Sequence, residues 1–228
     1  MKNPSELTVP LEAGAATTAL VYSSGGDATA ALVLAHGAGA GQRSAFMVDF
    51  ARALSGAGLD VATFNFPYTE QRRKIPDRAP VLEACYRSVI AAVRSAVPSA
   101  GRALFIGGKS MGGRIATQVA AGDPDLPIAG VVLLGYPLHP PGKPDQRRDK
   151  HLPAVATPML FVQGTRDAFG TPSELEPIVA GLKKAAVVHT VANGDHSFKI
   201  TRRDPAAQQS VYDGIRQTIV QWIRAVTP

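Results

Sequence analysis

The sequence predicts an α/β fold with a mostly parallel sheet, and three observations support this. Short apolar strands alternate with helical patterns along the 228 residues. Most of the strand segments are nearly continuous apolar runs, which is typical of strands that helices cover on both faces. The segments between them carry apolar residues at steps of three and four, the period of an amphipathic helix.

Eight segments have the length and composition of strands. In chain order they are residues 7–9, 17–22, 31–35, 61–66, 103–107, 130–134, 159–162 and 186–191. The first two lie close together in the chain, so we expect them to form an antiparallel pair. The other six are separated by helical patterns, which predicts parallel pairing among them.

The expected helices each have one apolar face. The first follows Ser44, a residue type that commonly caps a helix N-terminus, and ends before Gly58. Cys85 lies on the apolar face of the second, so we expect a packed core thiol and not a nucleophile. The apolar faces contain Phe46, Phe50 and Leu54 in the first helix, Leu82, Cys85, Val89 and Val93 in the second, and Val211, Ile215, Ile219, Trp222 and Val226 in the last.

The chain length suits one domain over residues 1–228, because a chain of this size buries roughly 70% of its unfolded surface. No internal repeat, low-complexity tract or linker interrupts it. Between Leu134 and Met159 lie about two dozen residues rich in proline and charge. They leave room for an irregular loop with a helical turn, and not for an independent helical cap domain.

The chain start and the cysteine count predict a cytoplasmic protein. Cys85 is the single cysteine, so no intramolecular disulfide forms. The first residues lack the apolar core of a signal peptide. No apolar run approaches the ~20 residues of a membrane-spanning helix, so we expect no membrane association.

The most informative stretch is Gly108-Lys109-Ser110-Met111-Gly112, a Gly-x-Ser-x-Gly sequence. It follows the expected strand at 103–107 and precedes a helical pattern at 115–120. This context is that of a nucleophile elbow, a tight turn whose glycines let the serine hydroxyl stand clear of the backbone. We therefore predict that Ser110 attacks an acyl carbonyl.

A serine hydroxyl needs a base and an orienting carboxylate, which follow the serine in the order acid, then histidine, in this kind of fold. Asp167 lies in the loop after the strand at 159–162, and His196 in the loop after the strand at 186–191. We predict that His196 accepts the serine proton and that Asp167 orients it. Asp195 is the alternative acid, and we favour Asp167 because a neighbouring residue rarely turns its carboxylate onto the ring.

The other histidines compete poorly for the role of base. His189 lies inside an expected strand and is predicted to be structural. His139 and His151 bracket the polar loop and are expected to be exposed. We expect His36 to be a hydrogen-bonded structural residue and not a second base.

Acyl transfer also needs donors for the developing oxyanion. We expect one from the backbone N–H of Met111, which directly follows the nucleophile at a helix N-terminus. The second should come from the glycine-alanine loop at residues 35–41, where Ala38 is favoured and Gly39 is the alternative.

Nucleotide and metal sites are excluded by spacing. The glycines of the loop at 37–41 are too closely spaced for a dinucleotide fingerprint. A phosphate-binding loop ending in Lys109-Ser110 needs glycine at position 103, where this chain has alanine. No histidine, cysteine and carboxylate cluster has metal-ligand spacing, so we predict no metal and no cofactor.

The net charge of +6 raises the question of a nucleic-acid partner. The basic residues cluster at 72–74, 147–150 and 202–203, in polar or proline-rich stretches without interleaved aromatics. We interpret them as solvated loop charge and expect no nucleic-acid partner. The alternative is that some of these arginines rim the site and favour an anionic substrate.

Taken together, the stretches at 36–39, 108–114 and 194–198 resemble the α/β-hydrolase superfamily. The match is greatest with the small, lidless hydrolase-like family related to dienelactone hydrolases, which includes the hydrolase-like domain of a chromatin acetyltransferase complex subunit. The resemblance implies an eight-stranded, mostly parallel sheet with helices on both faces and a pocket above the strand ends. Dienelactone hydrolases use cysteine where this chain has Ser110, so their specific reaction does not carry over.

We expect a serine hydrolase that cleaves carboxylic ester or thioester bonds of small substrates through an acyl-enzyme. The missing cap argues against a lipase with a lidded pocket. We expect the pocket walls to come from the loops at 66–80 and 136–152. The alternative is a binding or scaffold module that keeps the fold without turnover, although no member of the expected triad is lost.

Overall fold

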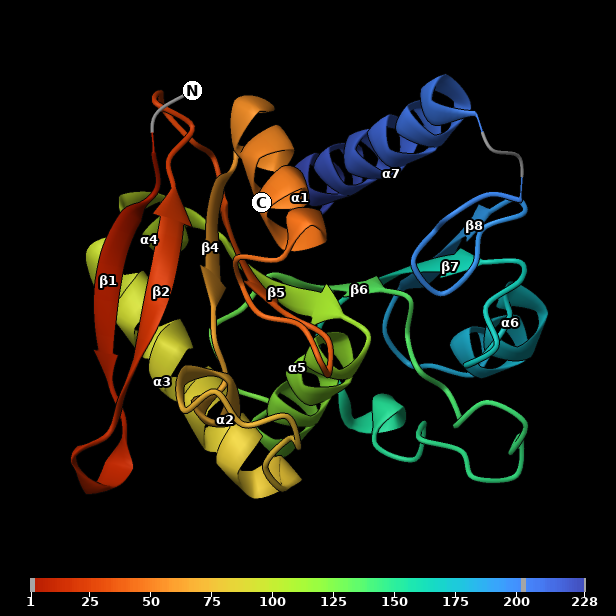
Figure 1. Ribbon diagram of the computed structural model, residues 1–228, viewed down its shortest axis with the longest axis horizontal. Helices are drawn as coiled ribbons and strands as arrows, with labels where there is room; N and C mark the ends of the chain where they lie inside the picture. Colours follow the sequence, from red (N-terminus) through yellow and green to blue (C-terminus); the bar gives the residue numbers. More distant parts are fainter. Residues whose placement is uncertain (1–2, 202–203, 228) are drawn as a thin grey trace.

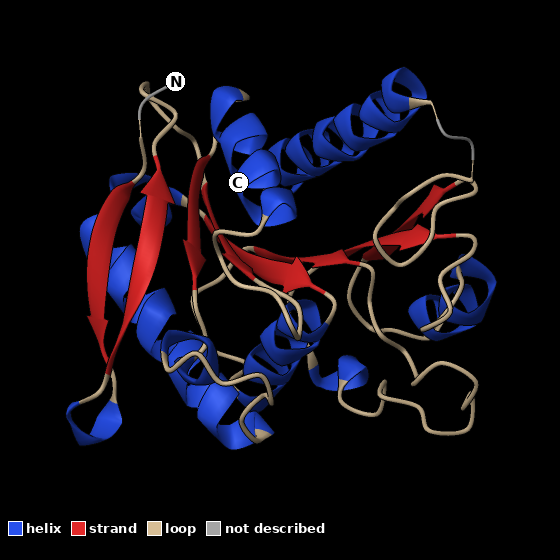
Figure 2. Ribbon diagram, in the orientation of Figure 1, coloured by secondary structure: helices blue, strands red, loops and turns tan. Residues whose placement is uncertain are grey.

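Eight strands form one twisted sheet with helices on both faces in the computed structural model, which describes residues 3–201 and 204–227 (Figures 1 and 2). The strands are β1 (Ser5–Pro10), β2 (Ala16–Tyr22), β3 (Ala31–Ala35), β4 (Asp60–Phe64), β5 (Leu104–Lys109), β6 (Gly130–Leu134), β7 (Met159–Gly164) and β8 (Ala186–Val191). Their spatial order is β1-β2-β4-β3-β5-β6-β7-β8.

The pairing confirms the predicted α/β class. β1 pairs antiparallel with β2, and β2 pairs antiparallel with β4. The pairs from β4 through β3, β5, β6 and β7 to β8 are all parallel. Each of the eight expected segments overlaps an observed strand, but β4 ends at Phe64, two residues before the expected end, because Phe66 caps a short helix instead.

Helices on the two faces belong to different parts of the chain. α1 and α7 cover one face, and α3 and α5 cover the other (Figure 2). The helices are α1 (Ala45–Gly56), α2 (Pro67–Glu70), α3 (Ala79–Ala96), α4 (Pro98–Arg102), α5 (Met111–Gly122), α6 (Pro172–Ala180) and α7 (Pro205–Val226), with 3₁₀ turns η1 (Glu12–Gly14) and η2 (Leu152–Ala154). α6 was not foreseen in the sequence, although Thr171 and Glu174 form a capping box at its start.

The apolar core divides into two clusters, one on each face of the sheet. Val33 of β3 points into the cluster under α3 and α5, while its neighbours Leu32 and Leu34 point into the cluster under α1 and α7. This alternation follows from the two-residue period of a strand. Cys85 is buried in the first cluster, as predicted for a core thiol.

The loop between β6 and β7 confirms the absence of a cap domain. Its residues 135–158 contain one 3₁₀ turn, η2, and otherwise irregular chain. This loop therefore places no helical lid over the carboxyl ends of the neighbouring strands. Within the described part of the chain, no helix has the length and hydropathy needed to cross a bilayer.

Candidate active site

The turn between β5 and α5 carries Ser110 in a strained backbone conformation. Ser110 has a φ of 52° and a ψ of −116°, although it is not glycine. A Cβ on Gly108 would lie 2.5 Å from the carbonyl oxygen of Ala35, and a Cβ on Gly112 would lie 2.4 Å from the same atom. Both positions therefore require glycine, because the end of β3 passes directly against the turn.

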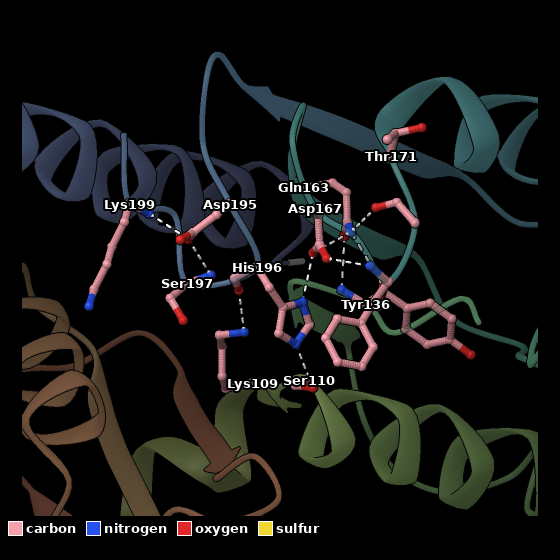
Figure 3. Close-up of polar contacts among 12 residues, drawn as sticks. Lys109, Ser110, Tyr136, Gln163, Asp167, Thr171, Asp195, His196, Ser197 and Lys199 are labelled. Carbon is pink, nitrogen blue, oxygen red and sulfur yellow. Dashed lines mark hydrogen bonds and ion pairs between the residues drawn. The ribbon is translucent and has the colours of Figure 1, made fainter. Parts of the chain in front are cut away.

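The structure brings Ser110, His196 and Asp167 into one hydrogen-bonded chain (Figure 3). The Oγ of Ser110 lies 2.8 Å from Nε2 of His196. The Nδ1 of His196 lies 2.7 Å from Oδ2 of Asp167. Since a carboxylate only accepts, Nδ1 carries a proton and Nε2 is free to accept the proton of the serine hydroxyl.

The carboxylate of Asp167 is fully buried and held on both oxygens. Its Oδ1 accepts a 2.8 Å bond from the backbone N–H of Phe169, and its Oδ2 accepts a 2.9 Å bond from Nε2 of Gln163. The ring of Phe169 stacks on that of His196, with centroids 4.2 Å apart. These contacts fix both the carboxylate and the plane of the imidazole.

Gln163 contacts Asp167, and the sequence analysis did not single it out. Its side chain is fully buried at the end of β7 and accepts a 2.8 Å bond from the Tyr136 N–H. Its Nε2 also donates to the carbonyl of Gly170, at 2.6 Å. The one signal in the sequence was a polar residue directly after the apolar run at 159–162, four positions before Asp167.

The loop that carries His196 is stabilised by Asp195 and Lys109 (Figure 3). Asp195 accepts bonds from the backbone N–H groups of Ser197 and Lys199, at 2.7 and 2.9 Å. Asp195 therefore shapes the turn, while Asp167 contacts the ring.

Lys109 is almost fully buried, and its ammonium donates a 2.5 Å bond to the carbonyl oxygen of His196. Burial lowers the pKa of Lys109 to about 8, although the nearby carboxylates of Asp167 and Asp195 partly offset this. Lys109, which directly precedes Ser110, thus holds the backbone of His196, the residue expected to act as base.

The two expected oxyanion donors lie beside Ser110. Met111 begins α5, so its N–H is among the first-turn groups that have no partner within the helix. Ala38 lies with Gly37 and Ser110 on the wall of one cavity. A Cβ on Gly37 would lie 3.5 Å from the Cβ of Ser110, so this loop runs directly past Ser110.

A cavity of about 540 Å³ opens beside Ser110 and His196. Its walls come from the loop after β3, the first two turns of α1, the end of β5, the loop after β8 and the first half of α7. The lining residues away from the serine and histidine include Ala40, Phe46, Met47, Asp49, Lys199 and Tyr212. The predicted walls at 66–80 and 136–152 were wrong, because no residue of either loop lines this cavity.

The two predicted basic clusters that the structure describes, at 72–74 and 147–150, do not line this cavity either. Residues 72–74 are exposed, as are Arg147 and Lys150, and Arg147 pairs with Asp149. Arg202 and Arg203 lie outside the described residues. The two described clusters therefore do not support the alternative that arginines rim the site and favour an anionic substrate.

Two expectations about the other histidines were wrong, since neither His139 nor His151 is exposed, and two were confirmed. His139 is buried, not exposed, because Nε2 contacts Glu174 at 3.1 Å under the loop after β6. His151 is half-buried, with Nε2 2.7 Å from the Thr117 hydroxyl. His189 lies in β8, and His36 is a fully buried, hydrogen-bonded residue, both as predicted. Among the described residues, no three histidine, cysteine or acidic side chains cluster as metal ligands would.

Comparisons with known proteins agree with this fold. A family model described as an alpha/beta hydrolase domain matches residues 28–224. The fold is similar to a dienelactone hydrolase from Anabaena variabilis, with a TM-score of 0.77 and 20% identity over 100% of both chains. It is also similar to a lidless α/β serine hydrolase from Xanthomonas campestris (TM-score 0.73, 18% identity, 100% of this chain and 97% of that one). An esterase from Pyrococcus furiosus gives a TM-score of 0.77 at 12% identity, covering 99% of this chain and 93% of the esterase.

Proposed function

Because the chain belongs to the alpha/beta hydrolase domain family, we propose that it is a serine hydrolase that cleaves carboxylic ester or thioester bonds. The observation that carries the proposal is the continuous hydrogen-bond chain from Ser110 through His196 to Asp167 at the wall of an open cavity. The esterases and serine hydrolases among its structural neighbours are consistent with that reaction.

The proposed reaction proceeds through an acyl-enzyme. Ser110 Oγ attacks the acyl carbonyl while its proton passes to Nε2 of His196, and the same proton then goes to the leaving alcohol or thiol. Asp167 keeps the other ring nitrogen protonated and stabilises the imidazolium that forms. Water, activated by His196, then releases the acid and regenerates the serine.

The N–H groups of Met111 and Ala38 would receive the negative charge that develops on the carbonyl oxygen. Donors fixed before the reaction lower the barrier without reorganising, and losing one typically costs about 10²–10³-fold in rate. Gly39 is the less favoured source of the second donor.

The substrate we propose is a small acyl ester or thioester that reaches the serine from solvent. The cavity of about 540 Å³ has no lid over it, so no long acyl chain would be enclosed. We further propose that residues 1–228 act as one domain in the cytoplasm, without a cofactor, a nucleic-acid partner or membrane association.

Labelling with a fluorophosphonate probe tests the proposal, because the probe reacts with an activated serine. We expect labelling of the folded wild-type protein and of Ser210→Ala, which removes an exposed serine of α7 far along the chain. Ser110→Ala and His196→Ala should lose labelling and lose ester hydrolysis by roughly 10⁴-fold or more. A folded wild-type protein that does not react would favour the alternative of a binding module without turnover.

A further inference from the structure

His36 is a fully buried histidine directly after β3, and the proposed hydrolysis assigns it no role. Its ring packs edge-on against the rings of Phe66 and Tyr68, with centroids 5.2 and 6.0 Å away. It directly precedes Gly37 and Ala38, the start of the loop that passes Ser110. Its orientation therefore affects the backbone that would bind the oxyanion.

The partners of His36 determine which ring nitrogen carries the proton. The backbone N–H of Phe66 donates a 3.2 Å bond to Nε2, so Nε2 must be the acceptor. Nδ1 lies 2.8 Å from the carbonyl oxygen of Gly37, which can only accept, so Nδ1 must be the donor. A single neutral tautomer, protonated at Nδ1, satisfies both contacts.

The Gly37 carbonyl and the Ala38 N–H belong to one peptide group. This peptide is trans, as are all peptide bonds of the described residues, so its C=O and N–H point in opposite directions. The carbonyl also accepts a 3.2 Å bond from the N–H of Ala40. Because the carbonyl is fixed toward His36, the Ala38 N–H points away from the ring. Ala38 itself lines the cavity together with Ser110.

We infer that His36 is a positioning residue for the oxyanion site: its Nδ1–H holds the Gly37 carbonyl and thereby aims the Ala38 N–H at the substrate oxygen. The inference rests on the proposed function. It assigns to a residue outside the Ser110–His196–Asp167 chain the task of orienting one oxyanion donor.

Burial favours the required neutral form of His36. It lowers the pKa of the imidazole, and the hydrogen bond to Gly37 and the nearby carboxylate of Glu70 offset only part of that effect. His36 therefore stays uncharged at neutral pH, and the tautomer is not lost by protonation under ordinary assay conditions.

Two substitutions separate the hydrogen bond that Nδ1 of His36 makes to Gly37 from the contacts of Nε2 with Phe66 and with the Thr69 hydroxyl, which lies 3.3 Å away. His36→Asn keeps an amide donor near the position of Nδ1 but loses the acceptor for Phe66. His36→Gln keeps an acceptor near the position of Nε2 but loses the donor to Gly37. We expect His36→Gln to lower kcat for an acyl ester by roughly 10- to 100-fold with little change in KM, below the full cost of losing one oxyanion donor. His36→Asn should keep the larger kcat of the two.

Equal kcat for His36→Gln and the wild type would overturn the inference, as would equal losses in both variants. If neither variant folds, ¹⁵N NMR of the wild-type protein decides. We expect His36 to show the Nδ1–H tautomer at pH 7 and no titration near the ordinary histidine pKa of about 6.5. An Nε2–H tautomer, or titration at that pH, would overturn it.

The proposed function fails in a different way. If the wild-type protein and Ser110→Ala hydrolyse esters equally, the serine hydrolase proposal is wrong whatever the His36 variants do. If Ser110→Ala is inactive while His36→Gln matches the wild type, the hydrolase stands and only the role of His36 is wrong.

Discussion

The turn that carries Ser110 and the loops that carry Asp167 and His196 are held in place by different means. Backbone atoms in direct contact hold the serine turn, since a Cβ on Gly108 or Gly112 would overlap the end of β3. Side-chain hydrogen bonds hold the other two loops, with Gln163 fixing the acid and Lys109 tying down the backbone of His196. The backbone-packed turn requires glycine at fixed positions on either side of Ser110. The loops of Asp167 and His196 can be held by many different combinations of side chains.

Among substitutions in the two loops that side-chain hydrogen bonds hold in place, Asp167→Asn should have the largest effect on activity. An asparagine amide would not keep the proton on Nδ1 of His196, so kcat should fall by roughly 10³–10⁴-fold. Asp195→Asn is the matched control, because an asparagine oxygen still accepts from the Ser197 and Lys199 amides. It should retain most of its ester hydrolysis. The opposite order of the two activities would move the acid assignment to Asp195.

Gly112→Ala tests whether close backbone contacts hold the turn that carries Ser110. The new methyl would lie 2.4 Å from the Ala35 carbonyl, so the turn and β3 must separate. We expect roughly 1–3 kcal/mol or more of lost unfolding free energy, and up to about 100-fold lower kcat from displacing the serine.

The matched control is Gly214→Ala in α7, where an added Cβ meets no atom within 4 Å. Alanine is the better helix former, so this variant should gain about 0.5–1 kcal/mol and keep its activity. Urea unfolding and ester assays measure both variants. If Gly112→Ala behaved like Gly214→Ala, close backbone packing would not be what holds the turn.

Gln163→Met sharpens the contrast, because it replaces a buried polar side chain with an apolar one of similar length. Asp167 would lose one donor, and the N–H of Tyr136 and the carbonyl of Gly170 would lose their partners. Each buried group left unpaired costs about 1–3 kcal/mol. We expect kcat to fall by roughly tenfold, while KM stays near the wild-type value because Gln163 does not line the cavity.

Gln209→Met, at an exposed position of α7, serves as the control for that substitution. It should leave kcat and stability close to the wild type. Steady-state kinetics and thermal unfolding are the measurements. An unchanged kcat in Gln163→Met would mean that the Phe169 N–H alone suffices to orient Asp167.

The smallest expected effect is on the pH dependence of stability, through His151, which contacts Thr117 of α5. Burial and the charge of Arg114 lower the pKa of His151 to about 4 from 6.5. Between these two values the unfolded chain binds the proton first, so stability should fall as pH drops from 6.5 toward 4.

His151→Gln should lose part of this pH dependence and keep its activity at pH 7. Urea unfolding of both proteins at pH 7, 5.5 and 4.5 gives the two slopes. Identical slopes of unfolding free energy against pH would show that the titration of His151 does not contribute to the pH dependence of stability.

The same contrast explains which parts of the site could be predicted from the sequence. Gly108, Ser110 and Gly112 follow one another because a tight turn allows few residue types, so they form a recognisable pattern. The strands were also predictable, since apolar runs and their spacing depend on local sequence. Asp167 and His196 could be predicted only from their order after known strands.

Gln163 and the cavity walls could not be predicted, because they depend on contacts between distant segments. Gln163 near the end of β7 meets Tyr136 in the loop after β6. Phe46 and Tyr212 reach the same cavity from α1 and α7, which are far apart in the chain. His139 was wrongly expected at the surface, since its partner Glu174 belongs to a helix that the sequence analysis did not include.

The irregular chain after β6 has a consequence for how this protein can accept new sequence. The carbonyl of Leu138 accepts a bond from the N–H of Arg148, which closes the base of an exposed loop over residues 141–147. The backbone bonds within it are local, as from Lys143 to Pro140, and Gly142 has open space around it. A peptide tag or a whole guest domain could be inserted at Gly142 without breaking a backbone hydrogen bond to the sheet, because the bond from Arg148 to Leu138 would still close the loop. The loop is thus a natural point of attachment that leaves the machinery around Ser110 untouched.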